Sequence, residues 1–224
     1  MKLFILFTIL GIALGQEITD KNKNLVADYK DIDTEALLTW EAPREFQKAF
    51  PYYLSGFDEE NAPIWIAEFG KWDVRKIIES GPENEKILRR YIQQFLKRAV
   101  ESRSLKSTAD IPVTEVNCII DMEGYGSQQA SSPPTLAVTM WFAGQIEQAW
   151  RNKLKSGFIV NSNYLFTTVW NLMKPLLGRN VYKVEVFGNN KDRWIPALLK
   201  TFPKSQIPEW YGGNKDHTPV KIYG

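Results

Sequence analysis

The feature that most constrains the fold of this chain is an apolar strand–helix–strand sequence in its last third. Residues 157–161 (GFIVN) and 181–187 (VYKVEVF) are apolar and typical of strands. Between them, residues 166–177 place apolar side chains at helical spacing. Parallel strands need a long crossover of this kind, usually a helix. The unit therefore favours an α/β fold with a largely parallel sheet.

Further predicted strands and helices extend the same alternation towards the N-terminus. A strand is predicted over 63–69, and the apolar run 116–122 is typical of a strand covered on both faces of a parallel sheet. Helices are predicted from 83 to about 102, from the Ser131-Ser-Pro-Pro134 segment onward, and after Asp192 as an N-cap. The pattern predicts one α/β domain.

The first fifteen residues differ from everything that follows. Lys2 gives a positive start, residues 3–14 are almost wholly apolar, and Ala13 and Gly15 are small residues at the positions that a signal peptidase reads. As a helix this run would span about 18 Å, well short of the roughly 30 Å hydrocarbon core of a bilayer. We predict a signal peptide over 1–15, secretion, an N-terminal extension over 16–37 and one domain over 38–224; the alternative is an uncleaved leader.

Composition excludes several classes of function. The formal charge of +2 over 224 residues indicates no general attraction to nucleic acid. The one cysteine, Cys118, can form no internal disulfide, and the one histidine, His217, rules out a multi-histidine metal site. We therefore expect a monomer without metal or cofactor and with no nucleic-acid partner.

Carboxylates are the remaining route to catalysis. Asp121 and Glu123 follow a predicted central strand, where alternation would put both on one face. A buried pair of this kind can shift its pKa values enough for acid–base work. A carboxylate hydrolase is therefore one interpretation of these two residues. The other is a structural role, in which they form hydrogen bonds to the backbone or to arginine.

Five short segments, in order along the chain, resemble the landmarks of a known family. They are Leu38-Thr-Trp-Glu-Ala-Pro43, Gly56-Phe-Asp58 with Pro63-Ile-Trp-Ile66, Ile120-Asp-Met-Glu-Gly124, Asn171-Leu-Met-Lys-Pro175 and Ile207–Gly213. The chain resembles the CRAL-TRIO lipid-binding domain over roughly 38–224, most closely the supernatant protein factor (tocopherol-associated) branch without its C-terminal β-sandwich. The resemblance implies a mostly parallel mixed sheet floored with helices, enclosing a hydrophobic cavity closed by a gate helix. It also implies a carrier rather than an enzyme.

The resemblance assigns the gate to the helix over 166–177. Its apolar stripe consists of Phe166, Val169, Trp170, Met173, Leu176 and Leu177, and the strands would add Ile120, Phe158 and Val160 to the cavity wall. By spacing alone, such a stripe is ordinary core. The resemblance instead makes these residues the contacts of one bound hydrophobic molecule.

The head-group positions depart from the pattern that the resemblance implies. Family members that transfer phosphatidylinositol carry a carboxylate, a hydroxyl and a lysine where this chain has Asn152, Asn180 and Lys183. Only Lys183 matches, so we predict that phosphatidylinositol is not the preferred ligand. Tocopherol-, retinoid-, carotenoid-, sterol- and phospholipid-like ligands remain open.

A membrane-docking or scaffold module is the competing non-enzymatic interpretation. The helix over 83–102 carries Arg89, Arg90, Lys97 and Arg98 on its polar side. Clustered basic side chains attract anionic lipid, although they are equally typical of an ordinary solvated helix surface. A transient contact with a membrane surface is expected for a lipid carrier as well.

Overall fold

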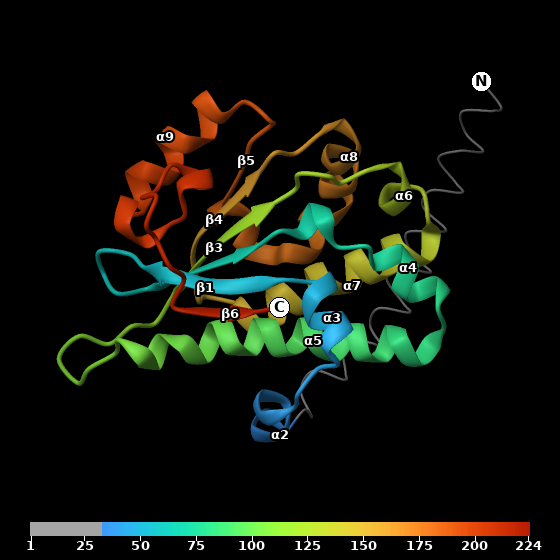
Figure 1. The fold of residues 1–224 in the computed structure, drawn as a ribbon, viewed down its shortest axis with the longest axis horizontal. Helices are drawn as coiled ribbons and strands as arrows, with labels where there is room; N and C mark the ends of the chain where they lie inside the picture. Colours follow the sequence, from blue (N-terminus) through green and yellow to red (C-terminus); the bar gives the residue numbers. More distant parts are fainter. Residues whose placement is uncertain (1–32) are drawn as a thin grey trace.

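In the computed structural model, which describes residues 33–224, the chain builds one six-stranded sheet in the order β5-β4-β3-β2-β1-β6 (Figure 1). The strands are β1 (Tyr52–Phe57), β2 (Pro63–Ala67), β3 (Val116–Asp121), β4 (Leu154–Val160), β5 (Val184–Val186) and β6 (Lys221–Tyr223). Strands β2 to β5 run parallel, while β1 is antiparallel to both of its neighbours. The predicted α/β fold with a mostly parallel mixed sheet is confirmed.

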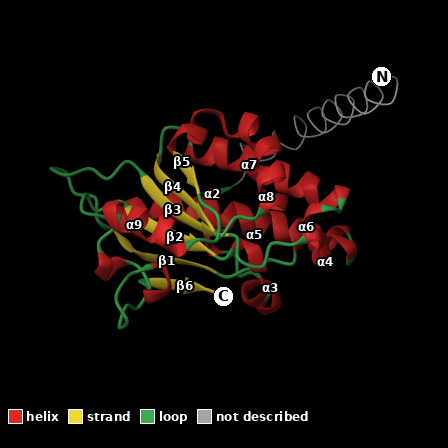
Figure 2. Cartoon of the chain, turned by 90° about the horizontal axis from the view of Figure 1, so that it is seen from above, coloured by secondary structure: helices red, strands yellow, loops and turns green. Residues whose placement is uncertain are grey.

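Helices cover both faces of this sheet (Figure 2). The α-helices are α2 (Thr34–Thr39), α3 (Arg44–Ala49), α4 (Val74–Glu79), α5 (Pro82–Glu101), α6 (Ser127–Ala130), α7 (Pro133–Trp150), α8 (Tyr164–Met173) and α9 (Lys191–Thr201). The 3-10 helices are η2 (Phe69–Lys71), η3 (Ser102–Leu105), η4 (Lys174–Lys183), η5 (Lys204–Gln206) and η6 (Glu209–Tyr211). Helix α5 begins one residue from its predicted start, because Gly81 and Pro82 together define it.

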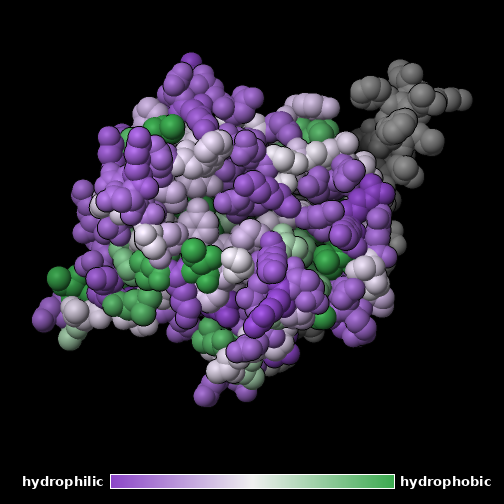
Figure 3. Space-filling view, in the orientation of Figure 1, coloured by the Kyte–Doolittle hydropathy of each residue, from purple (hydrophilic) through white to green (hydrophobic). Residues whose placement is uncertain are grey.

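Two separate apolar cores lie on the two faces of the sheet. On one face, α5, α7 and α8 bury a large aromatic core that includes Trp65, Phe95 and Trp150. On the other face, Trp194 and Leu198 of α9 lie in a smaller core with strand residues such as Ile119. Most of the surface visible in Figure 3 is hydrophilic, so the apolar side chains are largely internal.

Strand β1 is absent from the strands that the sequence predicts. In the structure, Gly56 pairs with Ile64 of β2 and lies directly under Gln206 of η5. A side chain at Gly56 would overlap Gln206, whose Oε1 accepts a hydrogen bond from the Phe57 amide at 3.0 Å. The glycine is therefore required by a close approach from a distant segment, which no local pattern reveals.

The predicted helix over 166–177 is wrong in its boundaries. Asn163 caps α8 by accepting a hydrogen bond from the Phe166 amide at 3.1 Å, and the α-helix ends at Met173. The chain continues as the 3-10 helix η4, with Pro175 near its start and a break at Gly178 (φ 53°, ψ −131°). Proline removes the hydrogen bond that an α-helix would need there. Strand β5 is shorter than predicted because η4 extends to Lys183, so the strand begins only at Val184.

The last helix, α9, begins slightly earlier than predicted. Asn190, not Asp192, is its N-cap, and its side chain accepts a hydrogen bond from the Asp192 amide at 2.9 Å. Asp192 instead lies in the first turn, where a negative charge is favourable to the helix dipole. The signal peptide predicted over 1–15 and the extension as far as residue 32 lie outside the described residues. No helix in 33–224 is long and apolar enough to cross a bilayer.

Candidate functional site

An apolar cavity of about 60 Å³ lies between the sheet and the helical layer. Strands β3, β4 and β5 form its floor, α7 forms one side, and α8 with η4 forms its roof. Its wall consists of Phe69, Phe95, Cys118, Ile120, Met122, Phe142, Ile146, Trp150, Leu154, Gly157, Phe158, Ile159, Phe166, Trp170, Met173, Leu177, Asn180 and Val184. A space lined this way excludes charged groups, because burying an unpaired charge is costly.

The roof contains four of the six residues of the predicted stripe. Phe166, Trp170 and Met173 of α8 and Leu177 of η4 all line the cavity. The ring of Phe166 stacks on that of Trp170, with centroids 6.3 Å apart. Two other stripe residues are placed differently: Val169 is buried in the surrounding core without lining the cavity, and Leu176 is half-buried at its margin.

The floor corrects the choice of strand residues. Ile120 faces the cavity and pairs with Ile159 of β4. Ile159 also lines the cavity but is not among the predicted residues. Val160 pairs with Asp121 and packs in the core under α9, on the opposite face. Phe158 borders the cavity, but its ring packs against Phe187 and Phe202 on that opposite face. Because side chains alternate along a strand, Phe158 and Val160 point to the opposite face from Ile159. The register of β4 against β3 places Ile159 beside Ile120 on the floor of the cavity.

Gly157 and Cys118 are small residues on the floor of the cavity, so they leave space above the sheet. A Cβ at Gly157 would lie 2.9 Å from Cγ2 of Val184, which is closer than such atoms approach. Cys118 pairs with Gly157, and burial raises the pKa of its thiol to about 12. A thiol with so high a pKa is unreactive at neutral pH, so Cys118 contributes packing rather than chemistry.

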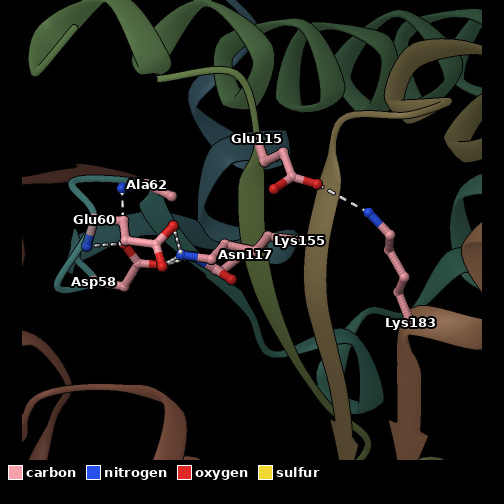
Figure 4. Close-up of polar contacts among 7 residues, drawn as sticks. All are labelled: Asp58, Glu60, Ala62, Glu115, Asn117, Lys155 and Lys183. Atoms are coloured by element: carbon pink, nitrogen blue, oxygen red, sulfur yellow. Dashed lines mark hydrogen bonds and ion pairs between the residues drawn. The ribbon is translucent and has the colours of Figure 1, made fainter. Parts of the chain in front are cut away.

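Lys183, the predicted head-group contact, lies at the edge of the cavity and is already paired. Its Nζ donates to Oε1 of Glu115 at 2.9 Å (Figure 4). It also donates to the backbone carbonyl of Leu154. Asn180 is buried in the cavity wall, and its Nδ2 donates to Oε2 of Glu147 at 3.0 Å. Asn152 is exposed in the turn after α7, with a positive φ of 60°. The three positions therefore do not form one open polar site.

Asp121 and Glu123 both line one surface pocket, but their environments differ. Asp121 is buried, and its two oxygens accept hydrogen bonds from the Glu123 amide (2.9 Å), Asn161 Nδ2 (2.8 Å) and the Tyr211 hydroxyl (2.9 Å). Glu123 lies exposed in the turn beyond the end of β3, so strand alternation does not extend to it. Burial raises the pKa of Tyr211, which keeps its hydroxyl protonated as a donor. Asp121 thus ties η6 to the sheet.

The basic side chains of α5 are engaged within the chain, which weakens the docking interpretation. Arg89 bonds to Glu85 and lies over the ring of Trp141. The other three also have partners: Arg90 lies over Trp40, Lys97 pairs with Glu101, and Arg98 bonds to the Tyr52 hydroxyl at 2.7 Å. These guanidinium and ammonium groups mainly secure the helix to its surroundings.

The cavity is small in this conformation. Sites for drug-sized ligands usually measure about 300–1,000 Å³, several times its volume. A bulky ligand therefore needs more space than this conformation provides. No three metal-ligating side chains come together within residues 33–224.

Comparison with known proteins agrees with this architecture. A model of the CRAL/TRIO domain family matches residues 47–213. Two proteins of Arabidopsis thaliana, the phosphatidylinositol/phosphatidylcholine transfer proteins SFH4 and SFH9, are 25% and 28% identical over 85% and 76% of this chain. The aligned region makes up only 31% and 29% of those two proteins.

A solved structure shares the fold at low sequence identity. The crystal structure of Sfh5 superposes with a TM-score of 0.55 and 13% identity, covering 83% of this chain and 65% of that one. The similarity extends over the sheet and its helices rather than a single motif. With the family match over most of the described residues, these findings show that the chain belongs to the CRAL/TRIO domain family.

Proposed function

We propose that this protein is a non-enzymatic carrier that binds one hydrophobic molecule in the cavity beneath α8. The observation that carries the proposal is the apolar wall itself, in which the roof residues Phe166, Trp170, Met173 and Leu177 face a floor built by β3 and β4. Burying a methylene group is worth about 0.8 kcal/mol, so a long acyl or isoprenoid chain is held without covalent help. The transfer activity named for the two plant relatives is consistent with this role.

Loading requires the roof to move, and the roof has a suitable break. Helix α8 ends at Met173, and Gly178 within η4 has a backbone conformation that side-chain-bearing residues rarely adopt. The outer surface of this roof exposes Tyr164, Leu172 and Tyr182. Aromatic and aliphatic side chains of this kind partition into a membrane interface. We propose that this outer surface makes the transient membrane contact during loading and release.

The ligand class proposed is an apolar molecule with a small polar end, such as a tocopherol, retinoid or carotenoid. A phosphatidylinositol head group needs its charge paired and its hydroxyls hydrogen-bonded when it is enclosed by protein. The only cation at the expected position, Lys183, is already bonded to Glu115. Competition of phosphatidylinositol against tocopherol, retinoid and carotenoid in a transfer assay tests this choice. Preferred transfer of phosphatidylinositol that Lys183→Ala abolishes would contradict it.

Export is a separate proposal that rests on residues 1–15. Lys2, the apolar run and the small residues Ala13 and Gly15 support cleavage before Gln16. N-terminal analysis of secreted material, allowing for a cyclised Gln16, should find this new end. Recovery of a cytosolic product that begins at Met1 would contradict export. A monomer without nucleic-acid partner or cofactor completes the proposal.

The carrier function is tested first by extracting the purified protein with organic solvent and analysing the extract by mass spectrometry. A stoichiometric lipid is expected. Trp170→Asp should then abolish loading, because it places a charge against the apolar wall. The matched control is Asn171→Asp, which introduces the same residue on the exposed side of α8. Equal loading of the wild type and a folded Trp170→Asp variant would refute the assignment of the roof.

A further inference from the structure

Three of the four basic side chains along the edge where β4 and β5 begin, Lys183, Arg151 and Lys155, are paired with carboxylates. Lys183 bonds to Glu115 at 2.9 Å, and Arg151 Nε bonds to Glu147 Oε1 at 2.9 Å. Lys155 bonds to Asp58 at 2.7 Å and to Glu60 at 2.9 Å (Figure 4). Lys153 donates to the carbonyl of Ala149, and burial lowers its pKa. Of these four cations, Lys183, Arg151 and Lys155 are thus held in ion pairs with carboxylates.

Lys183 and Asn180 are the polar groups of this edge that lie next to the cavity. Lys183 bonds to the carbonyl of Leu154 and directly precedes Val184, and both of these residues line the cavity. Asn180 lines the cavity itself. The partners of the two side chains, Glu115 and Glu147, therefore determine the charge that an incoming head group meets.

Glu147 is held in this position by the shape of η4. Its carboxylate receives the Asn180 amide and is only 16% exposed. It also lies against Gly178, where a Cβ would approach the carboxylate oxygens to 2.6 Å. Gly178 has a φ of 53°, so glycine satisfies both the backbone conformation and the close approach. Glu147 therefore bonds Arg151 through Oε1 and, through Oε2, Asn180, which lines the cavity.

We propose that Glu115 and Glu147 are specificity-determining residues that exclude phosphate-bearing head groups from the cavity. Glu115 neutralises Lys183, and Glu147 places a carboxylate directly behind Asn180. A phosphate arriving there would have to displace one carboxylate and lie near another, and juxtaposed like charges are strongly unfavourable. A neutral ligand with a hydroxyl or carbonyl end meets no such repulsion. The inference rests on the proposed carrier function and names the ligand property that the same cavity selects.

The test uses Glu115→Gln, Glu147→Gln and the double variant of the full chain. Each glutamine keeps the size and a carbonyl acceptor while removing the charge. Transfer of phosphatidylinositol and of tocopherol between phosphatidylcholine vesicles is measured for each protein. The double variant should gain phosphatidylinositol transfer by about tenfold or more, which corresponds to about 1.4 kcal/mol. Tocopherol transfer should stay within about twofold of the wild type, since that ligand carries no charge. Adding Lys183→Ala to the double variant should remove the gain.

Glu60→Gln is the matched control, because it removes the same charge from the Lys155 pair, which does not line the cavity. It should leave both transfer rates unchanged. The inference is overturned if the double variant gains nothing while tocopherol transfer persists, or if Glu60→Gln produces the same gain. If no protein in the set transfers or retains any lipid, the carrier function itself fails, and the inference falls with it.

Discussion

The two faces of the sheet are built from alternate residues of the same strands, yet only one face contains the cavity. Under α9, side chains such as Ile119, Phe158 and Val160 pack directly against Trp194 and Phe202. On the other face, Cys118, Ile120, Gly157 and Ile159 leave a space that the helices do not fill. Close packing is the normal condition of a protein interior, so the unfilled space on this face supports the proposal that a ligand binds there.

The largest expected effect that tests this comparison concerns the reactivity of Cys118. Its thiol lines the cavity, and burial raises its pKa to about 12. Compared with an ordinary cysteine of pKa about 8.5, the thiolate fraction at neutral pH should fall by about three orders of magnitude. Alkylation of the folded protein should be correspondingly slow, with labelling in denaturant as the reference. Rapid labelling of the native state would mean that the cavity is open to water.

A matched pair of phenylalanines separates the filled face from the hollow face. Phe202 is 2% exposed and packs under α9, whereas Phe166 is 3% exposed and borders the cavity. Phe202→Ala should lower the free energy of unfolding by about 3–5 kcal/mol, the usual loss for a buried aromatic. Phe166→Ala should cost less in ligand-free protein, since its ring lacks partner atoms on the cavity side. Denaturant titration measures both, and equal losses would show that the two faces are packed alike.

Gly178→Ala tests the junction between the roof and α7. The left-handed backbone conformation costs about 1–3 kcal/mol for a residue with a side chain. The new Cβ would also press on the Glu147 carboxylate. We expect a lower melting temperature and weaker lipid retention. Arg179→Ala, at the exposed neighbouring residue, is the control and should change neither property. If Gly178→Ala changes neither the melting temperature nor lipid retention, η4 accommodates the new side chain without strain.

The smallest expected effect is a loss of stability at acid pH from Asp58. Burial alone would raise the pKa of Asp58, but hydrogen bonds from Lys155, Asn117 and the Ala62 amide outweigh it and hold the pKa below its usual value. A carboxyl with a depressed folded-state pKa stabilises the protein above its unfolded value of about 3.9, and this contribution is lost as the pH falls through the folded value. Asp58→Asn should remove about 1 kcal/mol at pH 7 and flatten the acid limb of the stability curve. An unchanged acid limb would show that other carboxyls dominate.

Local sequence patterns predicted most of the helices and strands that build the sheet and its helical layer. Periodic apolar residues predicted α5 and α7, the run 116–122 predicted β3, and together they indicated a mostly parallel sheet. The stripe over 166–177 was assigned to the cavity by the family resemblance rather than by its spacing, and four of its residues line the cavity. Such patterns are readable because helical and strand periods depend only on near neighbours in the chain.

Only the tertiary structure decided which residues meet. The register of β4 against β3 placed Ile159, and not Val160, over the cavity. Contacts between distant segments required Gly56 beneath Gln206, and they paired Lys183 with Glu115 and Asn180 with Glu147. A side chain's charge or polarity is visible in the sequence, but its partner depends on segments that folding brings together from far along the chain. For this reason the family resemblance predicted an apolar cavity, whereas the pairing of the polar side chains beside it emerged only from the fold.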